Sequence, residues 1–221
     1  MTFRLESLLA AAQLERLRSR LLEAGTPWRP GQETAGWHAR LVKNNRQLDR
    51  QSELHRALAV ELETLLGAHP LLQAAAFPRR FHGLLFSRSG AGEGYGRHVD
   101  DAWMAGGRSD LSYTLFLSDP EAYSGGELVL EERGAEQRVK LPAGWAMVYP
   151  STLLHRVEPV QQGERLVAVG WIESRIREQE QRQLLFDLDT ARRTLFQRSG
   201  KDEIFDLISC SYSNLLRRWD R

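Results

Sequence analysis

Residues 94–100 read Gly94-Tyr95-Gly96-Arg97-His98-Val99-Asp100, and a second histidine, His155, follows much later in the chain. In a β-strand, residues i and i+2 point to the same face, so His98 and Asp100 are expected to converge on one point. Two imidazoles and one carboxylate form the facial triad that binds a ferrous ion and leaves coordination positions open. The pattern therefore predicts that His98, Asp100 and His155 surround one metal ion.

A lone cation follows the second histidine. Arg165 begins an apolar segment, Leu166-Val167-Ala168-Val169-Gly170, which ends at Trp171. A planar guanidinium is well suited to bind a carboxylate through two parallel hydrogen bonds. The sequence thus predicts a carboxylate-binding position beside the metal.

Each of these signals has an ordinary explanation when it stands alone. An H-x-D triplet occurs often by chance, a single histidine is more often a core or rim residue, and a single arginine usually lies at the surface. Their joint order is much harder to obtain by accident. Two other classes remain open: a zinc hydrolase, for which Arg165 has no obvious use, and a non-catalytic, cupin-like module that binds a metal or small ligand.

Further segments extend the pattern over most of the chain. They are Lys43-Asn44-Asn45, Leu115-Phe116-Leu117-Ser118-Asp119-Pro120, Gly125-Gly126-Glu127-Leu128, Tyr149-Pro150-Ser151, His155-Arg156-Val157 and Asn214-Leu215-Leu216-Arg217-Arg218-Trp219. Together with the H-x-D, H and R order, they resemble the Fe(II)- and 2-oxoglutarate-dependent dioxygenases of the prolyl/lysyl-hydroxylase type. Among these, the sequence is most similar to the bacterial PKHD-type (PiuC-like) hydroxylases.

The resemblance implies a set of ligands and roles. Fe(II) would be bound by the triad and 2-oxoglutarate by Arg165. Tyr113 or the neighbouring Ser112 could donate a hydroxyl to 2-oxoglutarate, although a strand tyrosine is more often a packing residue. Trp171 is expected to pack either under the cosubstrate or in the core. L-ascorbate would support activity. The family couples decarboxylation of 2-oxoglutarate to succinate and CO2 with hydroxylation by O2 of a small-molecule or peptide substrate, and its bacterial members are associated with iron acquisition.

Composition argues for a small partner. The 221 residues carry a formal net charge of +1, which calls for neither nucleic acid nor an anionic membrane. The only cysteine, Cys210, cannot form an intramolecular disulfide, so a reducing compartment is expected. The charged residues that interrupt the apolar N-terminal segment argue against a signal peptide or membrane span. These features predict a cytoplasmic protein.

The periodicity predicts a mainly β fold with flanking helices: a double-stranded β-helix (jelly roll, cupin-like) with N-terminal helices and a C-terminal helical extension. Three regions are expected, 1–76 as a helical or mixed support, 77–174 as the dioxygenase core and 175–221 as the extension. Helices are expected at 6–24, 52–66, 173–199 and 201–219, and the last two offer a surface for a homodimer. A short strand is expected at 37–42, and eight core strands at 81–87, 94–99, 111–118, 126–131, 136–141, 145–149, 153–158 and 165–173.

Several polar residues receive no role in the site. Arg97 is expected to point to the opposite face from His98 and to be structural. Lys43-Asn44-Asn45 could line the site or form a polar turn, and Asp101 stands where the resemblance leads us to expect asparagine. The remaining histidines lack the spacing of metal ligands, and the second and third of them are expected to face solvent. They are His38, His55, His69 and His82.

Overall fold

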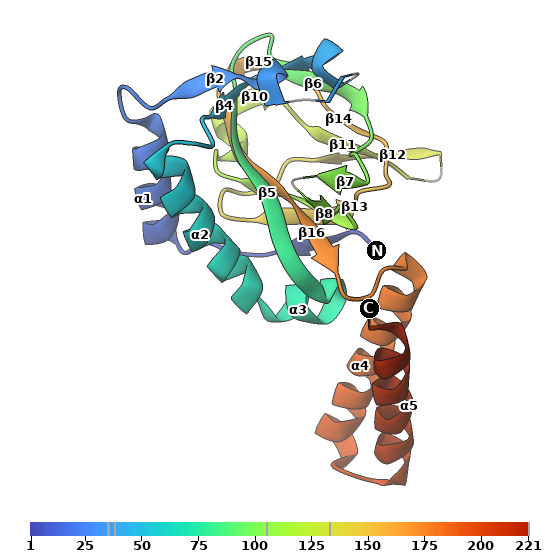
Figure 1. The fold of residues 1–221 in the computed structure, drawn as a ribbon. Helices are drawn as coiled ribbons and strands as arrows, with labels where there is room; N and C mark the ends of the chain where they lie inside the picture. The colour runs from blue at the N-terminus through green and yellow to red at the C-terminus, as the bar shows by residue number, and fades with distance from the viewer. Residues whose placement is uncertain (35, 38, 105, 133, 221) are drawn as a thin grey trace.

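Two antiparallel sheets form the body of the protein (Figure 1). The computed structural model describes residues 1–34, 36–37, 39–104, 106–132 and 134–220. Within these ranges, one sheet has seven strands in the order β1-β13-β9-β16-β5-β4-β2, and the other has five in the order β12-β11-β14-β6-β3. The expected jelly roll is confirmed.

The large sheet contains the long strands. Its bounds are β1 (Phe3–Leu5), β13 (Ala146–Pro150), β9 (Leu111–Phe116), β16 (Arg165–Ser174), β5 (Pro78–Ser89), β4 (Arg46–Leu48) and β2 (Trp28–Pro30). The small sheet contains β12 (Ala135–Val139), β11 (Leu128–Glu132), β14 (His155–Val157), β6 (Gly94–His98) and β3 (Lys43–Asn44). Two short pairs complete the described strands: β10 (Tyr123–Gly125) with β15 (Val160–Gly163), and β7 (Trp103–Met104) with β8 (Gly107–Arg108).

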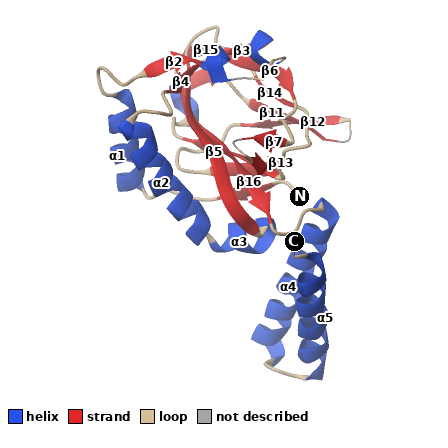
Figure 2. Cartoon of the chain, in the orientation of Figure 1, coloured by secondary structure: helices blue, strands red, loops and turns tan. Residues whose placement is uncertain are grey.

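The helices are unevenly distributed, as Figure 2 shows. Three α-helices, α1 (Ala11–Leu22), α2 (Glu53–Ala68) and α3 (Pro70–Ala76), cover the outer face of the large sheet. Short 3-10 helices lie at η1 (Gly31–Thr34), η2 (Ala39–Leu41) and η3 (Pro120–Ala122). The last two helices, α4 (Gln179–Ser199) and α5 (Glu203–Trp219), form a hairpin that projects from the body.

Strand alternation divides the core into two layers. Leu111, Tyr113 and Leu115 of β9 point toward the helices and join a cluster that includes leucines of α1 and α2. Phe116 belongs to the other cluster, between the two sheets, with residues of β11 and β13. Because successive side chains on a strand point to opposite faces, Ser112 and Thr114 point into the space between the sheets.

The N-terminal region differs from the expectation in three places. The expected helix at 6–24 is wrong at its start, because α1 begins only at Ala11. The leucine spacing suits a helix, but residues 6–10 form a turn in which Ser7 has a φ of +49°, and the Leu9 N–H donates to the Gly144 carbonyl. The strand expected at 37–42 is also wrong, because 39–41 form η2 and pairing starts at β3.

His55 is the third correction. It is only 8% exposed, and its Nε2 lies 3.0 Å from the Leu84 carbonyl oxygen, which ties α2 to β5. His69, also expected in solvent, is half-buried. Ser52 does form the expected N-cap of α2 and accepts a hydrogen bond from the His55 backbone N–H.

The core strands lie close to their expected positions, with ends that differ by a few residues. The β10–β15 pair was not expected, because its segments are short, contain glycines and lack a clear alternation. The first C-terminal helix starts at Gln179 and not at 173, because β16 continues to Ser174. The division into three domains stays a prediction; region 1–76 contributes strands to both sheets.

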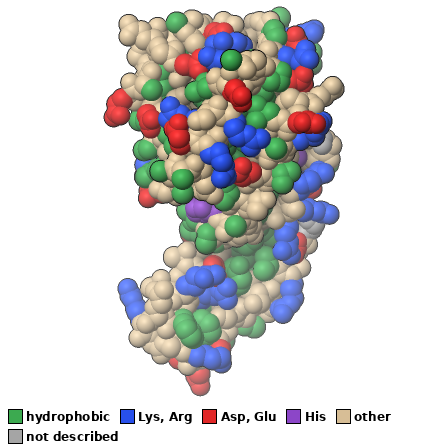
Figure 3. All heavy atoms as spheres, turned by 90° about the vertical axis from the view of Figure 1, so that its left-hand side faces the viewer, with side chains coloured by type: hydrophobic (Ala, Val, Ile, Leu, Met, Phe, Trp, Pro, Cys, Tyr) green, Lys and Arg blue, Asp and Glu red, His purple; other side chains and the backbone are tan. Residues whose placement is uncertain are grey.

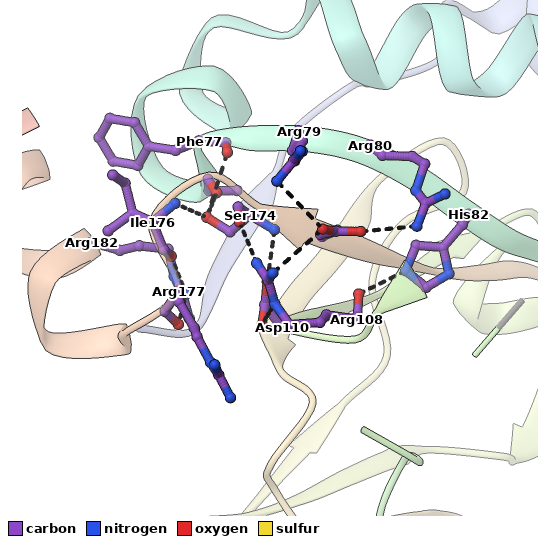
Figure 4. Close-up of polar contacts among 12 residues, drawn as sticks. Phe77, Arg79, Arg80, His82, Arg108, Asp110, Ser174, Ile176, Arg177 and Arg182 are labelled. Atoms are coloured by element: carbon purple, nitrogen blue, oxygen red, sulfur yellow. Dashed lines mark hydrogen bonds and ion pairs between the residues drawn. The ribbon is translucent and has the colours of Figure 1, made fainter. Parts of the chain in front are cut away.

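A polar network joins the hairpin to the body (Figure 4). Asp110, just before β9, accepts hydrogen bonds from Arg108 and from the backbone N–H of Ser174, and the Ser174 hydroxyl donates to the Ala76 carbonyl. Buried Arg182 of α4 donates to the carbonyls of Ile176 and Arg177. The chain between β16 and α4 is therefore fixed on both sides.

The hairpin carries exposed apolar side chains, and the space-filling view shows hydrophobic side chains on its surface (Figure 3). They include Leu184, Phe196, Ile204 and Leu207, of which Leu207 is 69% exposed. Among the described residues, no helix is long and apolar enough to span a membrane.

Candidate active site

The two histidines of the expected triad meet through strand pairing. β14 lies beside β6 in the small sheet, and His155 is directly opposite His98, so their ring centroids are 4.2 Å apart. Asp100 follows the end of β6, and its Oδ2 lies 3.9 Å from Nε2 of His155. The ligand atoms of the three side chains all lie within 4.8 Å of one another, the only such group among the described residues.

Both imidazoles are oriented by the backbone. Nδ1 of His98 lies 2.8 Å from the Gly96 carbonyl oxygen, and Nδ1 of His155 lies 3.0 Å from that of Leu153. A carbonyl only accepts, so Nδ1 carries the proton and Nε2 keeps a free lone pair for a metal. Burial and the neighbouring imidazole lower the pKa of His98, which favours the neutral, ligating form.

The carboxylate is oriented by two serines. The Ser112 hydroxyl donates to Oδ2 of Asp100 at 2.5 Å, and the Ser151 hydroxyl lies 2.7 Å from that of Ser112. Because the single proton of Ser112 is used on Asp100, Ser151 must donate to Ser112. Both serines are buried. Sequence reasoning considered Ser112 only as a hydroxyl donor to a cosubstrate.

Arg165 lies in the same cavity as the triad and is 3% exposed. Within the described part of the chain its guanidinium forms no ion pair, and its buried Nε has no hydrogen-bond partner. The charged head lies over the ring of Phe116, 5.6 Å from its centroid. A buried cation without a counter-ion is costly, so the arrangement fits an anionic ligand.

The two tyrosines near this strand have different positions. Tyr113 lines the cavity, is 1% exposed and also packs in the cluster beneath the helices, with its ring against Gly170. The ring of Tyr123, in β10, and the Arg165 side chain both border Gly126, and the Tyr123 hydroxyl interacts with Arg165. The buried hydroxyl of Tyr113 has no hydrogen-bond partner among the described residues. Sequence reasoning missed Tyr123 because its role depends on the irregular β10–β15 pair.

Trp171 also lines the cavity, where its indole N–H has no partner among the described residues. Its ring packs on Gly83, a position with φ +69° where a Cβ would come within 2.5 Å of the indole. The glycine therefore makes room for the tryptophan. The tryptophan lies where a ligand could contact it, and its expected role stays a prediction.

The segment Lys43-Asn44-Asn45, which the sequence left undecided, contains strand β3 and contributes to the cavity wall through Lys43 and Asn45. Asp101 is exposed and also borders the cavity. Arg97 points away and forms a double hydrogen bond with Glu131, as the strand alternation predicts.

Among the described residues, no other histidine joins the metal-ligand group. Nε2 of His82 lies 2.8 Å from the Arg108 carbonyl oxygen, which is a structural contact. His38 lies outside the described residues.

Comparison with known proteins identifies the family. Residues 84–173 match the model of the 2OG-Fe(II) oxygenase superfamily, and residues 179–220 match the PKHD-type hydroxylase C-terminal domain. A PKHD-type hydroxylase of Synechococcus elongatus is 53% identical over 99% of both chains, and one of Picosynechococcus is 50% identical over 99% of both.

A solved structure shares the fold. The Pseudomonas putida prolyl-4-hydroxylase is similar with a TM-score of 0.55 and 23% identity, over 79% of this chain and 92% of that one. The family implies Fe(II) and 2-oxoglutarate, and a His-Asp-His group beside an unpaired buried arginine fits both. The family also excludes the two alternatives that the sequence left open, a non-catalytic binding module and a zinc hydrolase. The chain belongs to the PKHD-type hydroxylases and is a 2-oxoglutarate-dependent dioxygenase.

Proposed function

We propose that His98, Asp100 and His155 bind Fe(II), that Arg165 binds the distal carboxylate of 2-oxoglutarate, and that the enzyme hydroxylates a small-molecule or peptide substrate. The observation that carries the proposal is that three ligand atoms within 4.8 Å of one another share a cavity with a buried arginine that forms no ion pair among the described residues. Bound Fe(II) and 2-oxoglutarate would supply O2 activation coupled to the formation of succinate and CO2.

The chain's own residues bind and orient. The backbone carbonyls of Gly96 and Leu153 keep both imidazoles in the ligating tautomer. Arg165 is 3% exposed, and a charge-assisted pair with a carboxylate is strong where it is shielded from solvent. We assign a hydrogen bond to the cosubstrate to Tyr123, because this tyrosine borders Arg165. The same role for Tyr113, and packing by Trp171, stay predictions.

The compartment, the supporting reductant and the biological role are proposed from the sequence and from the family. We propose a cytoplasmic enzyme, supported by L-ascorbate and linked to iron acquisition. A homodimer through α4 and α5 is supported by the exposed apolar side chains of that hairpin, with Leu207 at 69% exposure. Sedimentation of Leu207→Glu beside the parent protein tests the dimer, which predicts a lower mass for the variant.

Succinate production tests the enzymatic proposal. Iron-loaded protein is expected to convert 2-oxoglutarate slowly to succinate without substrate, and only when Fe(II), 2-oxoglutarate and O2 are all present. Arg165→Met should raise the KM for 2-oxoglutarate by about 100-fold or more, as expected for loss of a buried ion pair. The matched control is Arg138→Met, since Arg138 is a surface arginine with a 56% exposed side chain. Succinate release independent of Fe(II), or unchanged by Arg165→Met, would refute the proposal.

A further inference from the structure

One buried cation of the cavity remains unexplained. Lys43 is 5% exposed although lysine is among the residues least often buried. The chain has three lysines, and the other two, Lys140 and Lys201, do not line this cavity. Burial lowers the pKa of Lys43 to about 8, which reflects a charge removed from water.

The contacts of Lys43 leave its ammonium group incompletely paired. Nζ donates to the Thr34 hydroxyl at 3.2 Å, and this hydroxyl in turn donates to the buried side chain of Gln47. The ammonium lies over the ring of Tyr95, 5.2 Å from its centroid. Within the described part of the chain no carboxylate forms an ion pair with Lys43, so donors remain for a ligand.

The position of Lys43 relates it to the metal ligands. β3 pairs with β6, and Lys43 is directly opposite Tyr95 in the register. The Tyr95 ring stacks on the His98 imidazole with centroids 3.7 Å apart. The ammonium and the imidazole therefore both lie against the Tyr95 ring, and Lys43 extends from the small sheet, whereas Arg165 extends from the large sheet.

Charge balance indicates what the ammonium binds. The charges of Fe(II), the 2-oxoglutarate dianion, Asp100 and Arg165 cancel when all four occupy the cavity. Lys43 adds one positive charge that no described residue neutralises by an ion pair, and Asp101 at the rim is exposed. An uncompensated buried charge is destabilising unless a ligand supplies the counter-charge.

We propose that Lys43 is a specificity-determining residue that binds an anionic oxygen, such as a carboxylate, on the substrate to be hydroxylated. The inference rests on the proposed function and narrows its substrate class to molecules with an acidic group near the reacting carbon. The ammonium would hold that group beside Tyr95 and so fix which carbon faces the metal.

Carbon-13 labelling of the lysine ε-carbons tests the proposal directly, because three lysines give three assignable signals. Protein loaded with Zn(II), which is diamagnetic, and saturated with 2-oxoglutarate is titrated with N-acetylglycine and with neutral N-acetylglycinamide. The Lys43 signal is expected to shift saturably with the acid and not with the amide. Lys140 is the matched control, since it also lies over a tyrosine ring, 3.9 Å from the centroid of Tyr123, and its signal should not move.

Two variants separate binding from a structural role. Lys43→Met should weaken N-acetylglycine binding at least tenfold in calorimetry, and Lys43→Arg should restore most of it, while 2-oxoglutarate affinity is unchanged in both. The inference is overturned if the Lys43 signal does not respond to the acid, if the amide shifts it equally, or if Lys43→Met binds the acid as tightly as the parent. Failure of 2-oxoglutarate itself to bind in the same samples would instead refute the proposed function.

Discussion

The orientation of the Asp100 carboxylate depends on the Ser112 hydroxyl, which does not itself need to contact the metal or the cosubstrate. Ser112 donates to Asp100 and is itself held by Ser151, so two buried serines fix the orientation of the carboxylate that we propose as a metal ligand. Removing a hydrogen-bond partner of a metal ligand typically weakens metal affinity by about 10- to 100-fold.

Ser112→Ala should therefore weaken Fe(II) binding by about 10- to 100-fold and leave the fold intact. Ser109→Ala is the matched control, because Ser109 is also buried but its hydroxyl has no hydrogen-bond partner among the described residues. Anaerobic Fe(II) titration measures both. Equal affinities in the two variants would show that Ser112 does not position Asp100.

Substituting each of the two tyrosines tests which of them donates a hydrogen bond to the cosubstrate. Tyr123→Phe should raise the KM for 2-oxoglutarate by about 5- to 20-fold, as expected for a lost hydrogen bond to a charged group. If Tyr123 alone holds this role, Tyr113→Phe leaves the KM unchanged, because Tyr113 packs beneath the helices; if the role predicted for Tyr113 holds, this variant raises the KM instead. Steady-state succinate assays distinguish them, and the reverse outcome would assign the role to Tyr113.

At the scale of elements, His55 links helix α2 to strand β5. Its Nε2 lies 3.0 Å from the Leu84 carbonyl oxygen, and burial lowers its pKa below the ordinary value of 6.5. His55 therefore takes up a proton near pH 6.5 in the unfolded chain, but only at a lower pH in the folded chain. The contribution of neutral His55 to the free energy of unfolding is therefore fully present above pH 6.5 and is lost as the pH falls below that value.

The free energy of unfolding should therefore decrease below about pH 6.5, with a contribution from His55 of at most about 1.4 kcal/mol per pH unit. His55→Gln keeps a donor for the carbonyl and removes the titration, so its stability should depend less on pH over this range. Urea unfolding at a series of pH values measures the difference. Parallel curves for the parent and the variant would contradict this assignment.

The local sequence pattern predicted which segments form helices and strands better than it predicted which strands pair with one another. The triad could be found from sequence because H-x-D is a local spacing, and Arg165 because one polar residue begins an apolar strand. Lys43 could not be assigned, because its direction depends on the pairing of β3 with β6. Residues 6–10 were misread because their leucine spacing suits a helix, although the Leu9 N–H instead donates to the Gly144 carbonyl in the loop before β13.

At the scale of the molecule, the polar network around Asp110 connects three parts of the chain. It joins β9 through Asp110, the end of β16 through Ser174, and the β8 segment through Arg108 (Figure 4). The side chains of Arg108 and Asp110 are 17% and 10% exposed, so this ion pair is shielded from solvent. Breaking one partner leaves a charge poorly compensated.

Asp110→Asn should lower the free energy of unfolding by about 2 to 3 kcal/mol and make the α4–α5 hairpin more sensitive to proteolysis. Asp206→Asn, which disrupts an exposed pair with Lys201, should cost at most about 1 kcal/mol. Urea unfolding and limited trypsin digestion measure both effects. If the two variants were equally stable, the network would not fix the hairpin.

The central claim is that side chains from both sheets share one metal and one cosubstrate. An anaerobic crystal structure with Fe(II) and 2-oxoglutarate tests it most directly. The predicted result is a metal bound by Nε2 of His98, Nε2 of His155 and the Asp100 carboxylate, with the distal carboxylate of 2-oxoglutarate on Arg165. A metal bound elsewhere, or a cosubstrate whose distal carboxylate does not contact Arg165, would contradict the account.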